Sequence, residues 1–262
     1  MKFSNKRYQI KQCPCGKRNH DGKFIPFQDY EDKGHCYSCG KTFFPKQESP
    51  NKLEYIEKPL PLRTDYKEVE KDIWVKSVHE NDNLSWFLSE KEISYYDFDI
   101  CGQNNATIFW QFDINGRCMN GKKIIYDKKT GKRNKKYFPS FLYKKEDGYG
   151  TCFYMEQKII SFPNNTHINI VESEKTAIIA QHFNPDEIWL ASGGSNGITK
   201  EKAQVLYGRN ITVWLDCDEA SRTSAARSYK NLKQFHNDVI IKDPEPNLND
   251  GTDLADIILR DL

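Results

Sequence analysis

The sequence predicts an α/β protein whose C-terminal part forms a mostly parallel sheet flanked by helices, preceded by a mixed α+β segment and a small cysteine-rich module. Three observations indicate this organisation. Apolar runs alternate with helix-like segments after Asn165, turn motifs divide a strand-like stretch before it, and four of the eight cysteines lie within the first 40 residues. We therefore expect modules at residues 1–45, 65–160 and 161–262, with a linker at residues 46–64.

The C-terminal module has the clearest pattern. Apolar strand-like runs alternate with helix-like segments, and this alternation is typical of parallel sheets because each crossover between parallel strands usually contains a helix. Strands are expected at HINIVE, DEIWLAS, ITVWLD and DVIIKD. Helices are expected at SEKTAIIAQHF, after the glycines of GGSNGITKEKAQVLYG, at EASRTSAARSYKNLKQF and at TDLADIIL.

The preceding segments follow other periodicities. Residues 65–100 show helical spacing, whereas residues 106–160 are strand-like and contain the turns NGR and KKTGKRN. Asn-Gly and Thr-Gly turns are typical of antiparallel hairpins, so a mixed α+β subdomain is expected here. The linker is rich in proline and charge and has no sustained periodicity, so we expect it to let the first module move.

Composition and charge restrict the class of protein. The chain is 37% hydrophobic and 29% charged, which excludes a disordered protein. It has neither a run of roughly 20 apolar residues nor the apolar segment of a signal peptide, so we expect a cytoplasmic protein without membrane contact.

Charge is unevenly distributed along the chain. Residues 115–148 carry 11 Lys or Arg against 3 Asp or Glu, whereas residues 166–262 carry 10 Lys or Arg against 15 Asp or Glu. A basic block is often only solvated surface, but beside an acidic site it favours a polyanionic partner.

Three carboxylates are expected at one edge of the parallel sheet. Glu172 ends the strand HINIVE, and Asp216 and Asp218 follow ITVWL. Side chains two apart on an extended segment face the same way, so the two aspartates can project together while Cys217 points into the core. Such a cluster is costly without a cation, and Mg²⁺ or Mn²⁺ prefers oxygen ligands. The alternative is that these acids are surface residues at helix N-termini, where acids are favoured.

Two loops add candidates to this edge. The glycine-rich run that begins with Gly193 and Gly194 is expected to expose backbone N–H groups, as phosphate-binding loops do. The last loop contributes Asp250 and Asp253, either of which could complete a second metal position.

The N-terminal cysteines have the spacing of a zinc ribbon. Cys36 and Cys39 form a CxxC pair, and Cys13 and Cys15 form a tighter CxC pair. Structural Zn²⁺ takes four tetrahedral thiolate or imidazole ligands. We therefore expect these four cysteines to bind a structural zinc ion. Two residues remain alternatives to one of them, His20 and His35.

The basic block interleaves cations with aromatic residues, as single-strand-binding surfaces do. The alternative is a solvated hairpin whose aromatic residues fill a core. The candidate contacts to nucleic acid or nucleotide are Arg117, Lys122, Lys123, Lys135, Lys136 and Lys175, together with Gly193 and Gly194.

The order of VES, a glycine-rich turn, LDCD and a late acidic loop resembles the Toprim domain, which bacterial-type primases, topoisomerases and some nucleases share. The resemblance implies that Glu172 takes part in acid/base chemistry and that Asp216 and Asp218 bind Mg²⁺. The chain departs from the pattern at Ser173, where the family usually has glycine. The serine removes no metal ligand, so the departure concerns only catalytic activity.

The runs IFWQFDINGRCMNGKKIIYD, KYFPSFLY and CFYMEQKI are similar to the basic subdomain that precedes Toprim in bacterial-type primases. The zinc ribbon, the basic subdomain and the Toprim domain together resemble the primase core. The resemblance is strongest to Toprim proteins of mobile elements and phages. The resemblance implies a nucleotidyltransferase that makes short primers from nucleoside triphosphates on single-stranded DNA. It further implies catalysis with Mg²⁺ or Mn²⁺ and suggests a replicative helicase as a partner.

Two alternatives remain open. One is a non-catalytic DNA-binding protein like the recombination mediators, which pair zinc with Toprim but set the two close together, whereas here a long segment lies between them. The other is a Toprim nuclease, which would need no nucleotide site. A type I topoisomerase is disfavoured because the chain is too short for gate domains.

Overall fold

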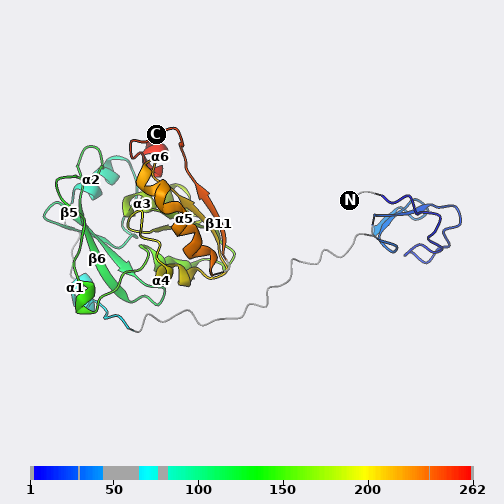
Figure 1. Cartoon of the computed structure of the whole chain (residues 1–262), viewed down its shortest axis with the longest axis horizontal. Coiled ribbons are helices and arrows are strands. Elements are labelled where there is room, and N and C mark those ends of the chain that lie inside the picture. Colours follow the sequence, from blue (N-terminus) through cyan, green and yellow to red (C-terminus); the bar gives the residue numbers. More distant parts are fainter. Residues whose placement is uncertain (1–2, 29, 44–64, 76–81, 236, 261–262) are drawn as a thin grey trace. The chain divides into compact units, whose positions relative to one another are not determined.

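The computed structural model describes residues 3–28, 30–43, 65–75, 82–235 and 237–260. The chain divides into two compact units, residues 1–58 and 59–262, and each is considered by itself (Figure 1). The predicted linker at 46–64 lies outside the described residues, so the motion expected of it stays a prediction. Within the described segments, no helix has the length and apolar character needed to cross a membrane.

The first unit is built on a small antiparallel sheet. Its strands are β1 (Phe24–Pro26), β2 (Gly34–Cys36) and β3 (Lys41–Phe43), in the order β1-β2-β3. Among the residues described in it, Cys13, Phe24 and Cys36 form a small buried cluster. A core of this size contributes little hydrophobic stabilisation, so a unit of this kind needs a further source of stability.

The second unit begins with two short helices and an antiparallel sheet. The helices are α1 (Lys71–Val75) and α2 (Asn83–Glu90). The sheet has the order β4-β5-β6-β7. Its strands are β4 (Ile100–Gln103), β5 (Ala106–Phe112), β6 (Cys118–Ile125) and β7 (Ser140–Phe141). The turn NGR joins β5 to β6 and the loop containing KKTGKRN joins β6 to β7, which confirms the predicted antiparallel hairpins.

Two secondary-structure predictions for this region are wrong in part. The helical spacing does not extend to residue 100, because turns follow α2 and β4 begins at Ile100. The strand-like pattern does not extend to residue 160, where the chain forms the 3-10 helices η1 (Lys145–Asp147) and η2 (Glu156–Ser161). Met155 adopts a left-handed φ of 67°, which ends any extended run. The buried Glu156 then accepts hydrogen bonds from the backbone N–H groups of Ile114 and Phe153.

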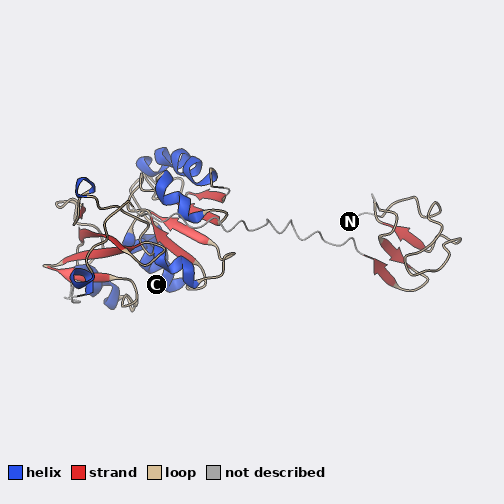
Figure 2. Cartoon of the chain, turned by 90° about the horizontal axis from the view of Figure 1, so that it is seen from below, coloured by secondary structure: helices blue, strands red, loops and turns tan. Residues whose placement is uncertain are grey.

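The C-terminal half forms a four-stranded sheet of parallel strands in the order β11-β10-β8-β9. The chain moves from β8 to β9 in one direction and from β10 to β11 in the other. Right-handed crossovers then place the connecting helices on opposite faces, and Figure 2 shows helices on both sides of the strands. The predicted α/β alternation is confirmed. The elements are β8 (Ile168–Val171), α3 (Glu174–Phe183), β9 (Ile188–Ala191), α4 (Lys200–Ala203), η3 (Gln204–Leu206), β10 (Asn210–Trp214), α5 (Glu219–Lys233), β11 (Asp238–Lys242) and α6 (Leu254–Arg260).

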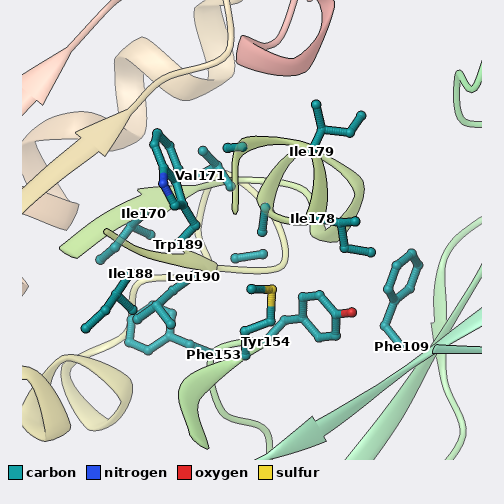
Figure 3. Packing of buried hydrophobic residues seen from close by; sticks show 14 of the residues in the cluster. Phe109, Phe153, Tyr154, Ile170, Val171, Ile178, Ile179, Ile188, Trp189 and Leu190 are labelled. Atoms are coloured by element: carbon teal, nitrogen blue, oxygen red, sulfur yellow. The ribbon is translucent and has the colours of Figure 1, made fainter. Parts of the chain in front are cut away.

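One hydrophobic core joins the two sheets of this unit. It runs from Phe109 on β5 through Tyr154 to Ile170 on β8 and Leu190 on β9 (Figure 3). The rings of Phe109 and Tyr154 meet edge to face with centroids 5.4 Å apart, a favoured aromatic geometry. Shared packing of this kind holds the basic sheet and the parallel sheet in a fixed relation, so residues from both contribute to one site.

Candidate functional site

The three predicted carboxylates lie at one edge of the parallel sheet. β8 and β10 are adjacent and parallel, with Val213 paired to Ile170, so their carboxyl ends meet. Glu172 directly follows β8, and Asp216 and Asp218 follow β10. In open α/β sheets this edge is where ligands bind.

Asp216 has the fewest polar partners of these three acids. Its pKa is raised to about 8, first by burial and then by the negative charges of Glu172, Asp253 and Asp218, against a smaller opposite effect of Lys175. Its carboxylate makes no hydrogen bond or ion pair with any residue that the structure describes. A largely buried carboxylate without a partner is unfavourable when charged, and a bound cation would remove that cost.

Glu172 and Asp218 are linked through Ser221, which the sequence did not lead us to expect. Asp218 Oδ1 caps α5 by accepting a hydrogen bond of 2.8 Å from the Ser221 backbone N–H. The Ser221 hydroxyl donates to Glu172 Oε1. Burial raises the pKa of Glu172, with Asp218 adding to this and the Ser221 hydrogen bond opposing it. Asp218 is therefore a helix cap, as the alternative predicted, and its charge still acts on Glu172 and Asp216. A serine three residues after a capping aspartate is the sequence signal for this contact.

A buried ion pair also missed from the sequence joins the basic sheet to this edge. Lys122 on β6 places Nζ 2.9 and 3.0 Å from the two carboxylate oxygens of Glu174, and 3.0 Å from the carbonyl oxygen of Gly193. The side chains are 9% and 0% exposed. Lys122 therefore neutralises a carboxylate inside the protein, and in this structure its ammonium is not free for a nucleic-acid phosphate.

Replacing Lys122 by alanine is expected to destabilise the second unit by about 3–5 kcal/mol, because Glu174 would remain buried without its counter-charge. The double variant K122M/E174L removes both charges and is expected to recover most of this loss. Urea unfolding followed by tryptophan fluorescence measures both. The neighbouring half-exposed Lys123 is the matched control, and K123A should cost less than about 1 kcal/mol. Equal effects of K122A and K123A would contradict the assignment.

The glycine-rich loop exposes fewer N–H groups than expected. Gly193 and Gly194 adopt φ values of 88° and 139°, which favour glycine. The Gly193 N–H donates to the carbonyl oxygen of Glu172 at 2.9 Å, and the Gly197 N–H donates to that of Gly194 at 2.8 Å. The N–H groups of Gly194, Ser195 and Asn196 have no acceptor within the described segments. These three are the groups that could meet a phosphate.

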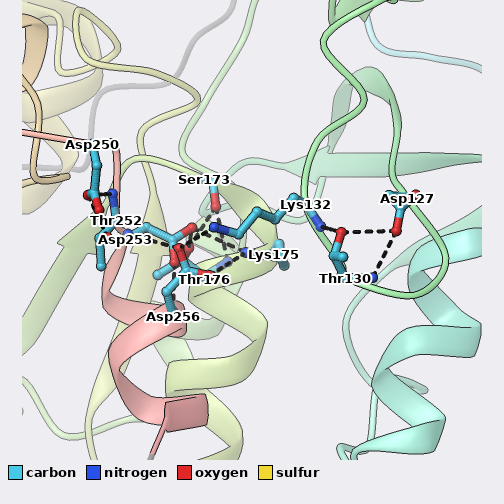
Figure 4. A network of polar contacts seen from close by, with 10 residues as sticks. All are labelled: Asp127, Thr130, Lys132, Ser173, Lys175, Thr176, Asp250, Thr252, Asp253 and Asp256. Atoms are coloured by element: carbon cyan, nitrogen blue, oxygen red, sulfur yellow. Dashed lines mark hydrogen bonds and ion pairs between the residues drawn. The ribbon is translucent and has the colours of Figure 1, made fainter.

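The late acidic loop is engaged with α3 and α6. Asp250 is exposed and accepts hydrogen bonds from the backbone and hydroxyl of Thr252. Asp253 lies deeper and contacts Lys175, whose Nζ is 3.2 Å from Asp253 Oδ2. Figure 4 shows this network. Lys175 is only 6% exposed, so its ammonium is held by a carboxylate and, as placed here, is not presented to a substrate phosphate.

The remaining candidate cations fall into two groups. Arg117 is paired with Asp113 at 2.8 Å, and the half-exposed Lys123 donates to Gln103. Lys135 and Lys136 are exposed. Beside them Phe138 is 92% exposed. In this segment, residues 135–138, exposed cations lie next to the most exposed of the aromatic rings that the structure describes.

The four N-terminal cysteines come together as predicted. The Sγ atoms of Cys13, Cys15, Cys36 and Cys39 all lie within 4.8 Å of one another. Tetrahedral Zn–S bonds of about 2.3 Å place sulfur atoms about 3.8 Å apart, so the donor set fits zinc. Burial raises the pKa of Cys13 to about 12, and hydrogen bonding from Cys13 lowers that of Cys15 to about 7.

The two alternative histidines are not part of this cluster. His35 Nδ1 contacts Thr42 Oγ1 at 2.8 Å, and His20 is exposed. Among the residues described, the cysteines are the one group of three or more potential ligand atoms that lie so close together. The carboxylates at the sheet edge are more widely spaced than that, although they influence one another's pKa values.

Comparison with known proteins gives a family and a fold. Residues 76–217 match the family described as "Domain of unknown function (DUF6371)". No curated protein matches the chain. The primase fragment of the bacteriophage T7 primase-helicase protein is similar in structure, with a TM-score of 0.50, 13% identity, and coverage of 96% of this chain and 95% of that one. At this identity the likeness is one of fold alone, and the chain has a primase-like fold.

Two bacterial-type structures are similar over shorter stretches. The DnaG catalytic core has a TM-score of 0.42 and 18% identity, with coverage of 60% of this chain and 48% of that one. A DNA primase domain from Pseudomonas aeruginosa has a TM-score of 0.41 and 15% identity, with coverage of 70% and 60%. The chain thus spans about half of the length of the DnaG core.

Proposed function

The chain belongs to the family described as domain of unknown function DUF6371, and we propose that it is a primase-like nucleotidyltransferase that makes short primers on single-stranded DNA. One observation carries the proposal. Glu172, Asp216 and Asp218 lie together at the edge of a parallel sheet, and the carboxylate of Asp216 has no protein partner among the described residues. The primase-like fold, with a cysteine cluster in the first unit, supports it.

We assign the parallel sheet with its helices to the Toprim class on the same grounds. The acids follow β8 and β10, the glycine-rich loop follows β9, and the last acidic loop precedes α6. The order of these features along the chain matches the order in the Toprim pattern, and the strand arrangement brings them to one edge.

In this proposal Asp216 and Asp218 would hold Mg²⁺ or Mn²⁺, and Glu172 lies beside them. The divalent cation would supply Lewis-acid stabilisation of charge on the transferred phosphoryl group. The reaction joins the 3′-oxygen of one nucleotide to the α-phosphorus of a nucleoside triphosphate and breaks the bond to pyrophosphate. Glu172, whose pKa is raised by burial, is suited to accept the proton that the 3′-hydroxyl loses. Ser221 orients Glu172 for this role through its hydrogen bond.

Two surfaces are assigned to the substrates. The N–H groups of Gly194, Ser195 and Asn196 are suited to phosphates of the triphosphate. The exposed segment 135–138 is suited to the template strand, because lysines attract phosphates and an exposed ring stacks on bases. The phage T7 neighbour is a fragment of a primase-helicase protein, and we extend the proposal to a helicase as partner.

We further propose that the cysteine cluster holds a structural zinc ion and that the first unit contacts the template. The four thiols supply the full ligand set, and the buried cluster around them in the described part of this unit is small. Lysines and arginines near the cluster, among them Lys17 and Arg18, supply positive charge for a DNA strand.

Phe138→Ala is expected to weaken binding of single-stranded DNA by about 1–3 kcal/mol, because one stacked base loses its platform. K135A/K136A should instead lower the slope of log affinity against log salt by about 1.4, since two phosphate contacts are lost. Fluorescence anisotropy with an oligonucleotide at several salt concentrations measures both. Tyr229, a half-exposed ring on α5, is the control, and Y229A should change neither quantity. Unchanged binding in both variants would contradict the assigned template surface.

One reaction separates the proposed function from its alternatives. Full-length protein is incubated with end-labelled single-stranded DNA, ribonucleoside or deoxyribonucleoside triphosphates, and Mg²⁺ or Mn²⁺. A primase yields new short oligonucleotides, a Toprim nuclease yields cleaved template, and a recombination-mediator-like protein yields only a shifted band. Cleavage or binding without synthesis would refute the primase proposal.

A further inference from the structure

Lys175 places a buried positive charge inside the acidic edge. Its Nζ lies 3.2 Å from Asp253 Oδ2 and 4.0 Å from Asp256 Oδ1. The side chain is 6% exposed, and its charge reaches Asp216, where it counteracts the neighbouring acids. The nearby carboxylates offset the cost of burying this charge.

Asp253 has little capacity left for a metal ion. Besides contacting Lys175, its Oδ2 accepts a hydrogen bond of 3.1 Å from the Thr176 hydroxyl, and its Oδ1 accepts one of 2.8 Å from the Asp256 backbone N–H. Figure 4 shows these contacts converging on Asp253 from α3 and α6. Both oxygens are therefore engaged, and one of them faces a cation.

The carboxylate of Asp216 differs from that of Asp253 because its oxygens are not engaged within the described segments. The Asp216 carboxylate accepts nothing from the described residues, while the carboxylate of Asp253 accepts two hydrogen bonds and forms an ion pair with Lys175. A divalent ion beside Asp216 would meet neighbouring acids whose negative charges outweigh the smaller effect of Lys175, and it would remove their repulsion. A second divalent ion at Asp253 would have to lie beside a fixed ammonium in a poorly solvated place, where like charges repel strongly.

We propose that Lys175 is a built-in counter-ion that takes the place of a second metal ion, so that Asp216 and Asp218, with Glu172 beside them, hold a single divalent cation. This inference rests on the proposed function, since it assumes that the acidic edge binds metal. Two-metal sites hold their ions about 3.5–4 Å apart so that both charges act on the reacting phosphate. Here the second positive charge is permanent, and Asp253 is a positioning residue for Lys175 rather than a metal ligand.

The number of bound Mn²⁺ ions tests this directly. Zinc-loaded full-length protein is titrated with MnCl₂, and free Mn²⁺ is measured by electron paramagnetic resonance. The native chain should bind one ion at the acidic edge, and D216N/D218N should bind none there. K175M should bind a second ion, because Asp253 and Asp256 lose their counter-charge. D250N, which alters the exposed acid of the same loop, is the control and should still bind one.

The double variant K175M/D253N removes one positive and one negative charge together, so it decides the question even if K175M does not fold. It should bind one Mn²⁺ with unchanged affinity. Three results would overturn the inference while leaving a metal site in place. They are two ions bound by the native chain, one ion bound by folded K175M, or an affinity that falls about tenfold or more in the double variant. No Mn²⁺ bound at the edge of the native chain would overturn both the inference and the proposed function.

Discussion

Asp216→Asn is expected to abolish primer synthesis and at the same time to stabilise the metal-free protein. Asparagine has nearly the same shape but cannot offer a charged oxygen ligand, so the site would lose its cation and the charge stabilisation that the cation supplies. We expect a fall of at least about 10²-fold in the rate of synthesis. Quantifying labelled products over time measures this effect.

The gain in stability follows from the pKa of Asp216. Its folded-state pKa of about 8 lies far above that of an unfolded aspartate. The native chain without metal should therefore lose stability as the pH rises from about 4 to about 8, because the unfolded state releases the proton earlier. D216N should lack this loss and unfold several degrees higher at pH 8.

Thermal unfolding with and without Mg²⁺ measures this difference. Mg²⁺ should raise the unfolding temperature of the native chain, since it binds only the folded state, and should leave that of D216N unchanged. Asp250→Asn is the matched control. The pKa of Asp250 is lowered by its hydrogen bonds to Thr252, so D250N should not stabilise the protein. A metal-free D216N that is less stable than the native chain at pH 8 would contradict the account.

Cys36→Ser should unfold the first unit and release its zinc. Cys36 is 1% exposed and is one of three residues in the small buried cluster of that unit. Structural zinc contributes about 10–16 kcal/mol of binding free energy in small zinc-dependent domains, and no hydrophobic core of this size replaces it. We expect the zinc content measured by mass spectrometry to fall from one atom per chain to near zero.

Limited proteolysis of the full-length protein shows whether the effect is local. The first unit of C36S should be digested rapidly while the second unit stays resistant, because their cores are separate. Cys101, a buried cysteine of the second unit, is the control, and C101S should keep its zinc. Retention of zinc by C36S, or a first unit that resists protease without zinc, would refute the structural role of the metal.

The parallel sheet could be predicted because three of its four strands, β8, β9 and β10, are buried along most of their length. The runs INIV, IWLA and NITVW are mostly apolar and rich in isoleucine, valine and tryptophan, which is the signature of such strands. The stretch around Met155 could not be predicted. Its residues are apolar and strand-like, but the left-handed Met155 and the contacts of Glu156 with Ile114 depend on tertiary structure.

The acidic edge could be predicted in outline and not in detail. The rule that ligands bind beyond the carboxyl ends of parallel strands brings Glu172 and Asp216 together once β8 and β10 are neighbours. The pairing of Lys122 with Glu174 could not be foreseen, because it joins a strand of the antiparallel sheet to helix α3, and no local pattern encodes how these two elements pack. For the same reason, sequence position did not separate the exposed Lys135 from the buried Lys175.

The most direct test of the central claim compares the native chain with D216N/D218N in the same synthesis reaction. Single-stranded DNA, labelled nucleoside triphosphates and Mg²⁺ or Mn²⁺ are supplied, and products are identified by mass. We expect short template-complementary oligonucleotides from the native chain and their loss when the metal is chelated. The double variant should make none, although it still binds DNA. Equal synthesis by the double variant, or no synthesis by the native chain with either metal, would contradict it.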